Sequence, residues 1–180
     1  MEIREMGRDD CLQALADAKV ARLACAIENQ PYVTPVYLAF YQPECAEPCL
    51  YGFATQGQKV EWMRANPSVC VEVDEIEGMD KWMSVVVFGR YEELPNEPEQ
   101  NIGRVAGTQA SRLHEESSQP SASINERLFA YQLLQSHAMW WEPATSARTL
   151  SGSNPTNQVN PIFYKIRINE VTGYRTVPSN

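Results

Sequence analysis

The chain has 180 residues, which suits one well-packed domain, and no internal repeat is evident. Its formal net charge of -8 argues against a nucleic-acid partner or an anionic membrane surface, so any anionic ligand must be bound by local groups. The first ten residues contain no apolar run, and no later segment approaches the length of a membrane span. We therefore expect a cytoplasmic protein.

The five cysteines are an odd number, and nothing in the sequence indicates secretion, so we interpret them as free thiols. Cys45 and Cys49 have a spacing found in zinc sites, but a second pair of ligands is missing nearby. The only histidines, His114 and His137, lie far along the chain. We predict no metal site.

The first quarter of the chain predicts a helix followed by a β-hairpin. Apolar positions three and four residues apart indicate a helix over 11–16. The apolar runs 20–27 and 32–41 flank the polar turn 28–30 and predict two paired strands. Pro35 cannot donate to a neighbouring strand, so it implies an edge or a bulge, and the residues alone favour an ordinary edge strand.

The stretch LYGFATQGQKVEWMRANPSVCVEVDE, residues 50–75, predicts a strand, a turn, a short helix and a second strand. The helix must end at Asn66, because the following proline excludes the helical conformation there. Unpaired backbone N–H groups at the helix start, together with the Thr55 hydroxyl and Lys59, would make a phosphate site. A simple cap at Thr55 with a solvated Lys59 is the alternative, and the residues alone favour it.

The remainder of the chain predicts a long strand, a helix and a final strand separated by polar segments. Gly89 lies inside the long strand and indicates a bulge or a close backbone approach. Several short strands joined by turns favour a small antiparallel barrel. The predicted segments are a strand at 82–94, a partly helical polar insertion at 95–120, a helix at 123–134, a strand at 137–141, a polar loop at 142–160 and a strand at 162–168.

Three blocks in this order carry a resemblance to a known family: ARLACAIENQPYVTPVYLAFY, the stretch 50–75 and WMSVVVFGRYEEL, with a weaker match at IFYKIRINEVTG. They resemble the pyridoxamine 5′-phosphate oxidase-related FMN-binding proteins. The resemblance implies a mainly β fold with flanking helices, a six-stranded antiparallel split barrel that forms one domain over residues 1–180. It also implies a homodimer that binds FMN at its interface.

The resemblance assigns the phosphate end of the site to the start of the short helix. Lys59 corresponds to the lysine that binds the FMN phosphate, and Gln58 stands where many relatives have an arginine. Because one cation is missing, Thr55 and the backbone of the turn would contribute more to phosphate binding. The strand end beside the ribityl phosphate corresponds to Gly52, Phe53 and Ala54.

The flavin ring is assigned to other strands. Pro35 and Val36 lie on the strand whose backbone faces the ring, which makes Pro35 a ligand neighbour rather than a plain edge residue. Ser84 matches a polar residue near the ring. Trp141, or its neighbour Trp140, lies where the oxidase has an aromatic residue near the ring, with a core or interface position as the alternative.

Two departures from the family pattern limit the function. The oxidase's carboxy-terminal arginine motif has no match beyond Arg148, so we do not expect pyridoxamine phosphate oxidation. The chain more closely resembles the branch with nitroimidazole-resistance proteins, many of which carry a histidine at the position of Phe53.

The expected function is electron transfer between FMN and a small unidentified substrate, with no catalytic residue assigned. One alternative is a flavin-binding or storage protein without turnover. Another is a haem-binding split barrel, whose axial ligand would have to be His114 or His137.

Overall fold

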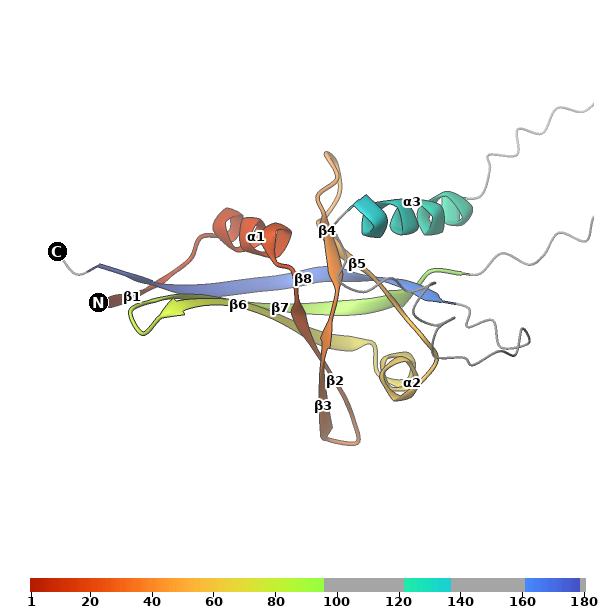
Figure 1. The fold of residues 1–180 in the computed structure, drawn as a ribbon. Coiled ribbons are helices and arrows are strands. Elements are labelled where there is room, and N and C mark those ends of the chain that lie inside the picture. The colour runs from red at the N-terminus through yellow and green to blue at the C-terminus, as the bar shows by residue number, and fades with distance from the viewer. Residues whose placement is uncertain (96–121, 137–160, 179–180) are drawn as a thin grey trace, which may run out of the picture.

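The computed structural model describes residues 1–95, 122–136 and 161–178 (Figure 1). The predictions for most of 95–120, for 137–141 and for 142–160 lie outside the described residues, and so do both histidines. The elements in chain order are β1 (Glu2–Glu5), α1 (Arg8–Asp17), β2 (Ala21–Ile27), β3 (Gln30–Val36), β4 (Leu38–Tyr41), β5 (Cys49–Ala54), α2 (Gln58–Ala65), β6 (Ser68–Gly78), β7 (Lys81–Glu93), α3 (Ala122–Ser136) and β8 (Ile162–Val177).

The strands of the described residues form one antiparallel sheet in the order β3-β2-β6-β7-β8-β5-β4, with β1 paired to β8. The two ends of this path, β3 and β4, are joined through Tyr37 alone, so the sheet curves round on itself. This arrangement confirms the mainly β fold with flanking helices. The sheet has eight strands in the described residues, two more than expected, because β1 was not predicted and the strand expected over 32–41 is divided.

The division at Tyr37 corrects the predicted hairpin. Only β3 pairs with β2, whereas β4 leaves that neighbour and pairs with β5. Pro35 lies at the edge of the path, opposite Arg22, where its missing N–H costs no ladder hydrogen bond. Glu28 and Asn29 form the connecting turn and have positive φ angles of 49° and 66°, typical of a tight hairpin.

The strands β6 and β8 are longer than predicted, whereas β7 has the predicted length, shifted by one residue. Between the predicted strands, β6 continues past residue 75, because the ladder between β6 and β7 continues to the pair Gly78–Lys81. The strand β8 extends to Val177 rather than ending at residue 168, since its second half pairs with β7 and β1. Figure 1 shows these long strands projecting to one side, where β1 lies beside the end of β8.

Alternating side chains of the strands fill the inside of the barrel. Among the most buried are Leu23, Val71, Val87, Tyr164 and Ile166. Gly89 marks a bulge, as predicted: the register between β7 and β8 shifts between Phe88 and Gly89. A side chain at Gly89 would lie 2.5 Å from the backbone oxygen of Arg167, so only glycine fits there.

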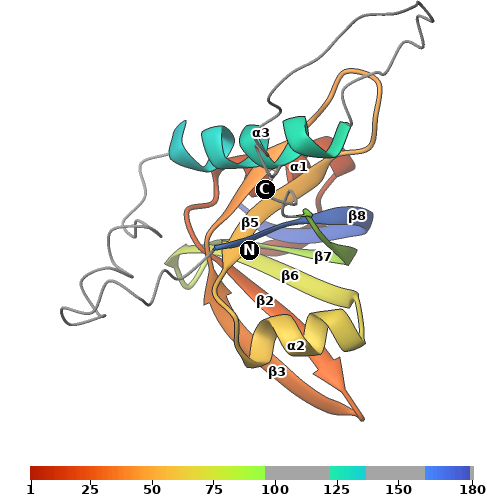
Figure 2. The same cartoon turned by 90° about the vertical axis from the view of Figure 1, so that its right-hand side faces the viewer.

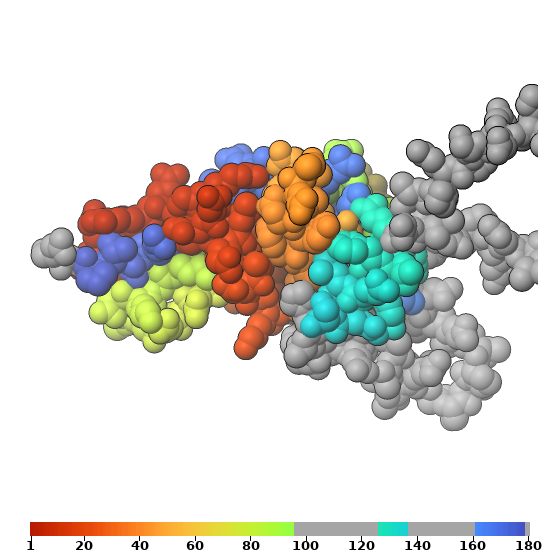
Figure 3. All heavy atoms as spheres, turned by 90° about the horizontal axis from the view of Figure 1, so that it is seen from above, coloured from red at the N-terminus to blue at the C-terminus, as the bar shows by residue number. Residues whose placement is uncertain are grey.

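Helices cover the sheet on both sides. In Figure 1, α1 and α3 lie on one side of the long strands and α2 on the other, and Figure 2 shows α2 beside β2 and β3. Seen from above, the residues of β4 and the following loop separate α1 from α3 (Figure 3). Beneath α3 lies a second core, whose buried members include Tyr51, Phe53, Ala130 and Phe163.

Candidate functional site

The turn between β5 and α2 leaves several backbone donors open. The first hydrogen bond at the start of α2 runs from the Glu61 N–H to the Gly57 oxygen at 3.1 Å. Among the described residues, the N–H groups of Gln58, Lys59 and Val60 therefore have no backbone acceptor, and no side chain caps the helix. The predicted cap at Thr55 is wrong, because Thr55 is exposed and Gly57 occupies the N-cap position. These donors point out of the helix start, where an anion would bind.

Lys59 lies beside these donors and is partly buried. Burial lowers its pKa, while the nearby Cys25 thiol acts in the opposite direction. No carboxylate in the described part of the chain forms an ion pair or hydrogen bond with Lys59. A partly desolvated cation without a counter-charge favours an anionic ligand.

The helix α2 is firmly packed, so Lys59 and the turn have a defined position. Val60 and Met63 are fully buried in the main core. Trp62 contacts Tyr32 of β3 edge-to-face, with ring centroids 5.7 Å apart. At its end, the Asn66 side-chain amide donates to the Ala26 oxygen at 2.9 Å and links the helix to β2.

The three predicted residues of β5 are buried in the protein. A side chain at Gly52 would lie 2.6 Å from the Tyr164 ring and 2.7 Å from Leu38, so core packing alone requires glycine there. Phe53 is 4% exposed and lies in the second core, 6.4 Å from the Phe163 ring. Ala54 belongs to the main core. A ligand beside this strand would meet its backbone rather than these side chains.

The outer face of the sheet brings together residues predicted from distant parts of the sequence. Pro35 is exposed there, opposite Arg22, and Ser84 lies opposite Asp74 two strands further on. Arg22 forms ion pairs with Asp74 and, at 2.8 Å, with Glu72. The Ser84 hydroxyl is 3.4 Å from the Glu72 carboxylate. A charged row therefore crosses this face between the two predicted ring neighbours.

Sequence reasoning did not assign this charged row. Its signal was present, since Arg22 is the only charge in an otherwise apolar strand, and Glu72 and Asp74 alternate with buried valines. Val36, by contrast, has its side chain in the main core and is 7% exposed. Trp140 and Trp141 lie outside the described residues.

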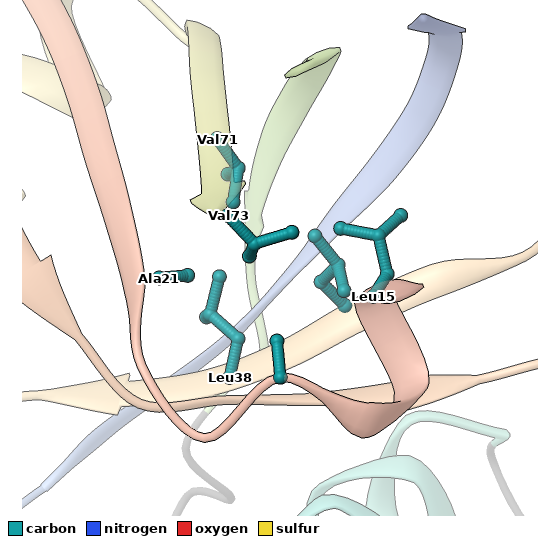
Figure 4. Close-up of a pocket in the computed structure, with 7 residues that line it drawn as sticks. Leu15, Ala21, Leu38, Val71 and Val73 are labelled. Atoms are coloured by element: carbon teal, nitrogen blue, oxygen red, sulfur yellow. The ribbon is translucent and has the colours of Figure 1, made fainter. Parts of the chain in front are cut away.

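A small pocket lies elsewhere, beneath α1 (Figure 4). Its lining is entirely aliphatic and contains none of the predicted site residues; it consists of Leu15, Ala18, Ala21, Leu38, Leu50, Val71 and Val73. Such a lining offers no donor for a phosphate.

Three further features of the described residues bear on the expected cofactors, thiols and location. No group of three or more His, Cys, Asp or Glu side chains that could bind a metal occurs in the described ranges. All five cysteines are free thiols, as predicted. None of the described helices is both long and apolar enough to cross a membrane.

Comparisons with known proteins agree with this architecture. A family described as pyridoxamine 5′-phosphate oxidase matches residues 7–135. An uncharacterized protein of Rhizobium meliloti (strain 1021) is 33% identical over 176 residues, which cover 96% of this chain and 95% of the relative.

Two crystal structures extend the comparison. One, of a protein named FAD-binding from Mesorhizobium loti, has 33% sequence identity and a TM-score of 0.64, and covers 99% of each chain. Another, of an FAD-binding protein from Mycobacterium smegmatis, has a TM-score of 0.56 at 12% identity, covers 97% of this chain and 100% of that one, and shows likeness of fold alone. The match over most of the chain and the 33% identical relatives show that this chain belongs to the pyridoxamine 5′-phosphate oxidase-related family.

Proposed function

We propose that this protein binds a flavin, and that it binds the flavin phosphate at the start of α2. The observation that carries the proposal is Lys59, a partly buried cation with no carboxylate partner in the described residues, beside the open N–H groups of Gln58 and Val60. A phosphate would receive hydrogen bonds from those donors and neutralise the lysine.

The comparisons support a flavin in general, and the choice of FMN remains our proposal. The Mesorhizobium loti relative is named as FAD-binding, and it is similar to this chain over its whole length. FMN and FAD both carry a phosphate on the ribityl chain, so Lys59 suits either one. The sequence resemblance favours FMN, because its blocks match FMN-binding proteins.

The flavin site would be completed by a second copy of the chain, in a cytoplasmic homodimer. The predicted ring neighbours Pro35 and Ser84 lie on the outer face of the sheet, whereas Lys59 lies at the start of α2. A second copy that covered this outer face would complete the site, which supports the arrangement. A bound flavin supplies the redox chemistry, accepting and donating electrons with a small substrate. The chain's own residues would bind the phosphate, orient the ring and restrict access of water.

The first test is flavin binding by wild-type protein and by Lys59→Met. We expect the wild type to acquire the visible absorption of bound FMN, and Lys59→Met to bind FMN more than about tenfold more weakly, because a charge-assisted hydrogen bond is lost. Lys81→Met is the matched control, since Lys81 is exposed and forms an ion pair with Glu77 in the β6–β7 hairpin. Equal affinity of the wild type and Lys59→Met would place the phosphate elsewhere.

A second measurement separates the redox enzyme from a flavin-binding protein without turnover. The FMN-loaded wild type is mixed with a reduced nicotinamide, and absorbance of the donor is followed with and without an electron acceptor. Donor oxidation supports the oxidoreductase, whereas tight FMN binding without donor oxidation supports a storage role. The kinship with nitroimidazole-resistance proteins stays a prediction.

A further inference from the structure

The turn in front of α2 is fixed by the last turn of the same helix. The Arg64 guanidinium donates from Nη1 to Gln56 Oε1 at 3.0 Å. Gln56 in turn donates from Nε2 to the Glu61 carboxylate at 3.4 Å. One side chain of the turn is therefore bound to two residues of the helix that follows it.

Arg64 itself is anchored to the end of β7. Its Nε and Nη2 donate to the two carboxylate oxygens of Glu93 at 2.7 and 2.8 Å. The Tyr91 hydroxyl donates to the same carboxylate at 3.2 Å, and the Tyr91 N–H donates to the Pro67 oxygen at 2.9 Å. The bidentate contact between Arg64 and Glu93 fixes the plane of the guanidinium as well as its position.

The charge of Arg64 is already balanced by this contact. Its guanidinium lowers the pKa of Glu93, so the carboxylate stays ionised at neutral pH. Arg64 thus differs from Lys59, which has no carboxylate partner in the described chain. The same guanidinium also donates to Gln56, a residue of the turn that enters α2.

We propose that Arg64 is a positioning residue for the flavin phosphate, acting through Gln56 and without contacting the ligand. The inference rests on the proposed flavin function. A turn that is ordered before binding keeps the N–H groups of Gln58 and Lys59 aimed at one point, so less freedom is lost when the phosphate binds.

The experiment compares FMN with riboflavin, which lacks the phosphate. Dissociation constants are measured by flavin fluorescence for wild type, Arg64→Met, Gln56→Ala and Arg90→Met. We expect Arg64→Met and Gln56→Ala each to weaken FMN binding about fivefold, the factor that corresponds to one hydrogen bond of about 1 kcal/mol, with riboflavin unchanged. Arg90 is exposed on the same strand as Glu93 and is the control for lost positive charge.

Glu93→Gln tests whether Arg64 acts only by position. The variant frees the guanidinium from its anchor, so we expect weaker FMN binding, as in Arg64→Met. Tighter FMN binding would show that Arg64 binds the phosphate directly and would overturn the inference. Equal losses for FMN and riboflavin would also overturn it, because they would indicate general damage to the fold.

The outcome distinguishes this inference from the proposed function. If the wild type binds neither flavin, the proposed function fails. If the wild type binds FMN and Lys59→Met weakens it, but Arg64→Met and Gln56→Ala keep the wild-type ratio of FMN to riboflavin affinity, only the positioning role fails. Thermal unfolding of each variant confirms that the proteins compared are folded.

Discussion

Replacing Gly89 with alanine tests the close approach of β7 to β8. The new methyl carbon would lie 2.5 Å from the Arg167 carbonyl oxygen and 2.7 Å from Ile166 Cγ2. The oxygen belongs to the backbone of a strand held on both sides, by β7 and by β5, so it cannot move without disturbing the ladder. Overpacking of this kind costs about 1–3 kcal/mol, and a backbone contact belongs to the upper end of that range.

The net loss of stability in Gly89→Ala is smaller than the free-energy cost of the clash. Alanine reduces the freedom of the unfolded chain and returns about 0.4–1 kcal/mol. We therefore expect Gly89→Ala to lower the free energy of unfolding by about 2 kcal/mol, which corresponds to a fall in Tm of about 4–8 °C for a chain of this length.

Thermal unfolding followed by circular dichroism is the assay, with Gly78→Ala as the matched control. Gly78 lies at the end of β6, where a methyl group would meet nothing closer than Asp80 Oδ1 at 3.8 Å. We expect this control to keep or slightly raise the wild-type Tm. If Gly89→Ala and Gly78→Ala unfolded at the same temperature, the contact between the two strands would be looser than the geometry indicates.

Further predictions concern the buried Tyr164 hydroxyl and the partly buried Lys59. The Tyr164 hydroxyl is buried without a hydrogen-bond partner in the described residues, so Tyr164→Phe should raise the free energy of unfolding by about 1 kcal/mol, measured by urea denaturation; a loss of stability would reveal a partner. Burial lowers the pKa of Lys59, so the lysine loses its charge at a lower pH than an exposed lysine does. We therefore expect FMN affinity to fall as the pH rises through the pKa of Lys59. Lys59→Arg should remove this loss of affinity, because arginine keeps its charge. Between the lowered pKa and the ordinary value of 10.5, Lys59 binds fewer protons in the folded chain than in the unfolded chain. The contribution of Lys59 to the stability of the flavin-free protein therefore rises with pH over this range.

Local patterns in the sequence determined most of the elements. Alternating valines predicted β6 and the glycine in β7 predicted its bulge, because side-chain period and backbone freedom are local properties. The residues Asn66 and Pro67 marked the end of α2 for the same reason, since proline excludes the helix wherever the chain lies. The start of α2 beside Lys59 was also predicted, although its cap was not.

The tertiary structure alone decided which neighbours each segment has. The break at Tyr37 occurs because β3 pairs with β2 whereas β4 pairs with β5. The apolar run over these residues does not indicate such a change of pairing partner. The outer-face contact of Arg22 with Asp74 joins residues 52 apart, and the anchoring of Arg64 on Glu93 joins residues 29 apart. Side-chain period gives the face on which a residue lies, whereas the residue it meets there depends on how strands distant in sequence are aligned. The sequence alone therefore predicted a lysine at a helix start, and only the fold showed that this lysine has no carboxylate partner in the described residues and that the turn before it is held by Arg64.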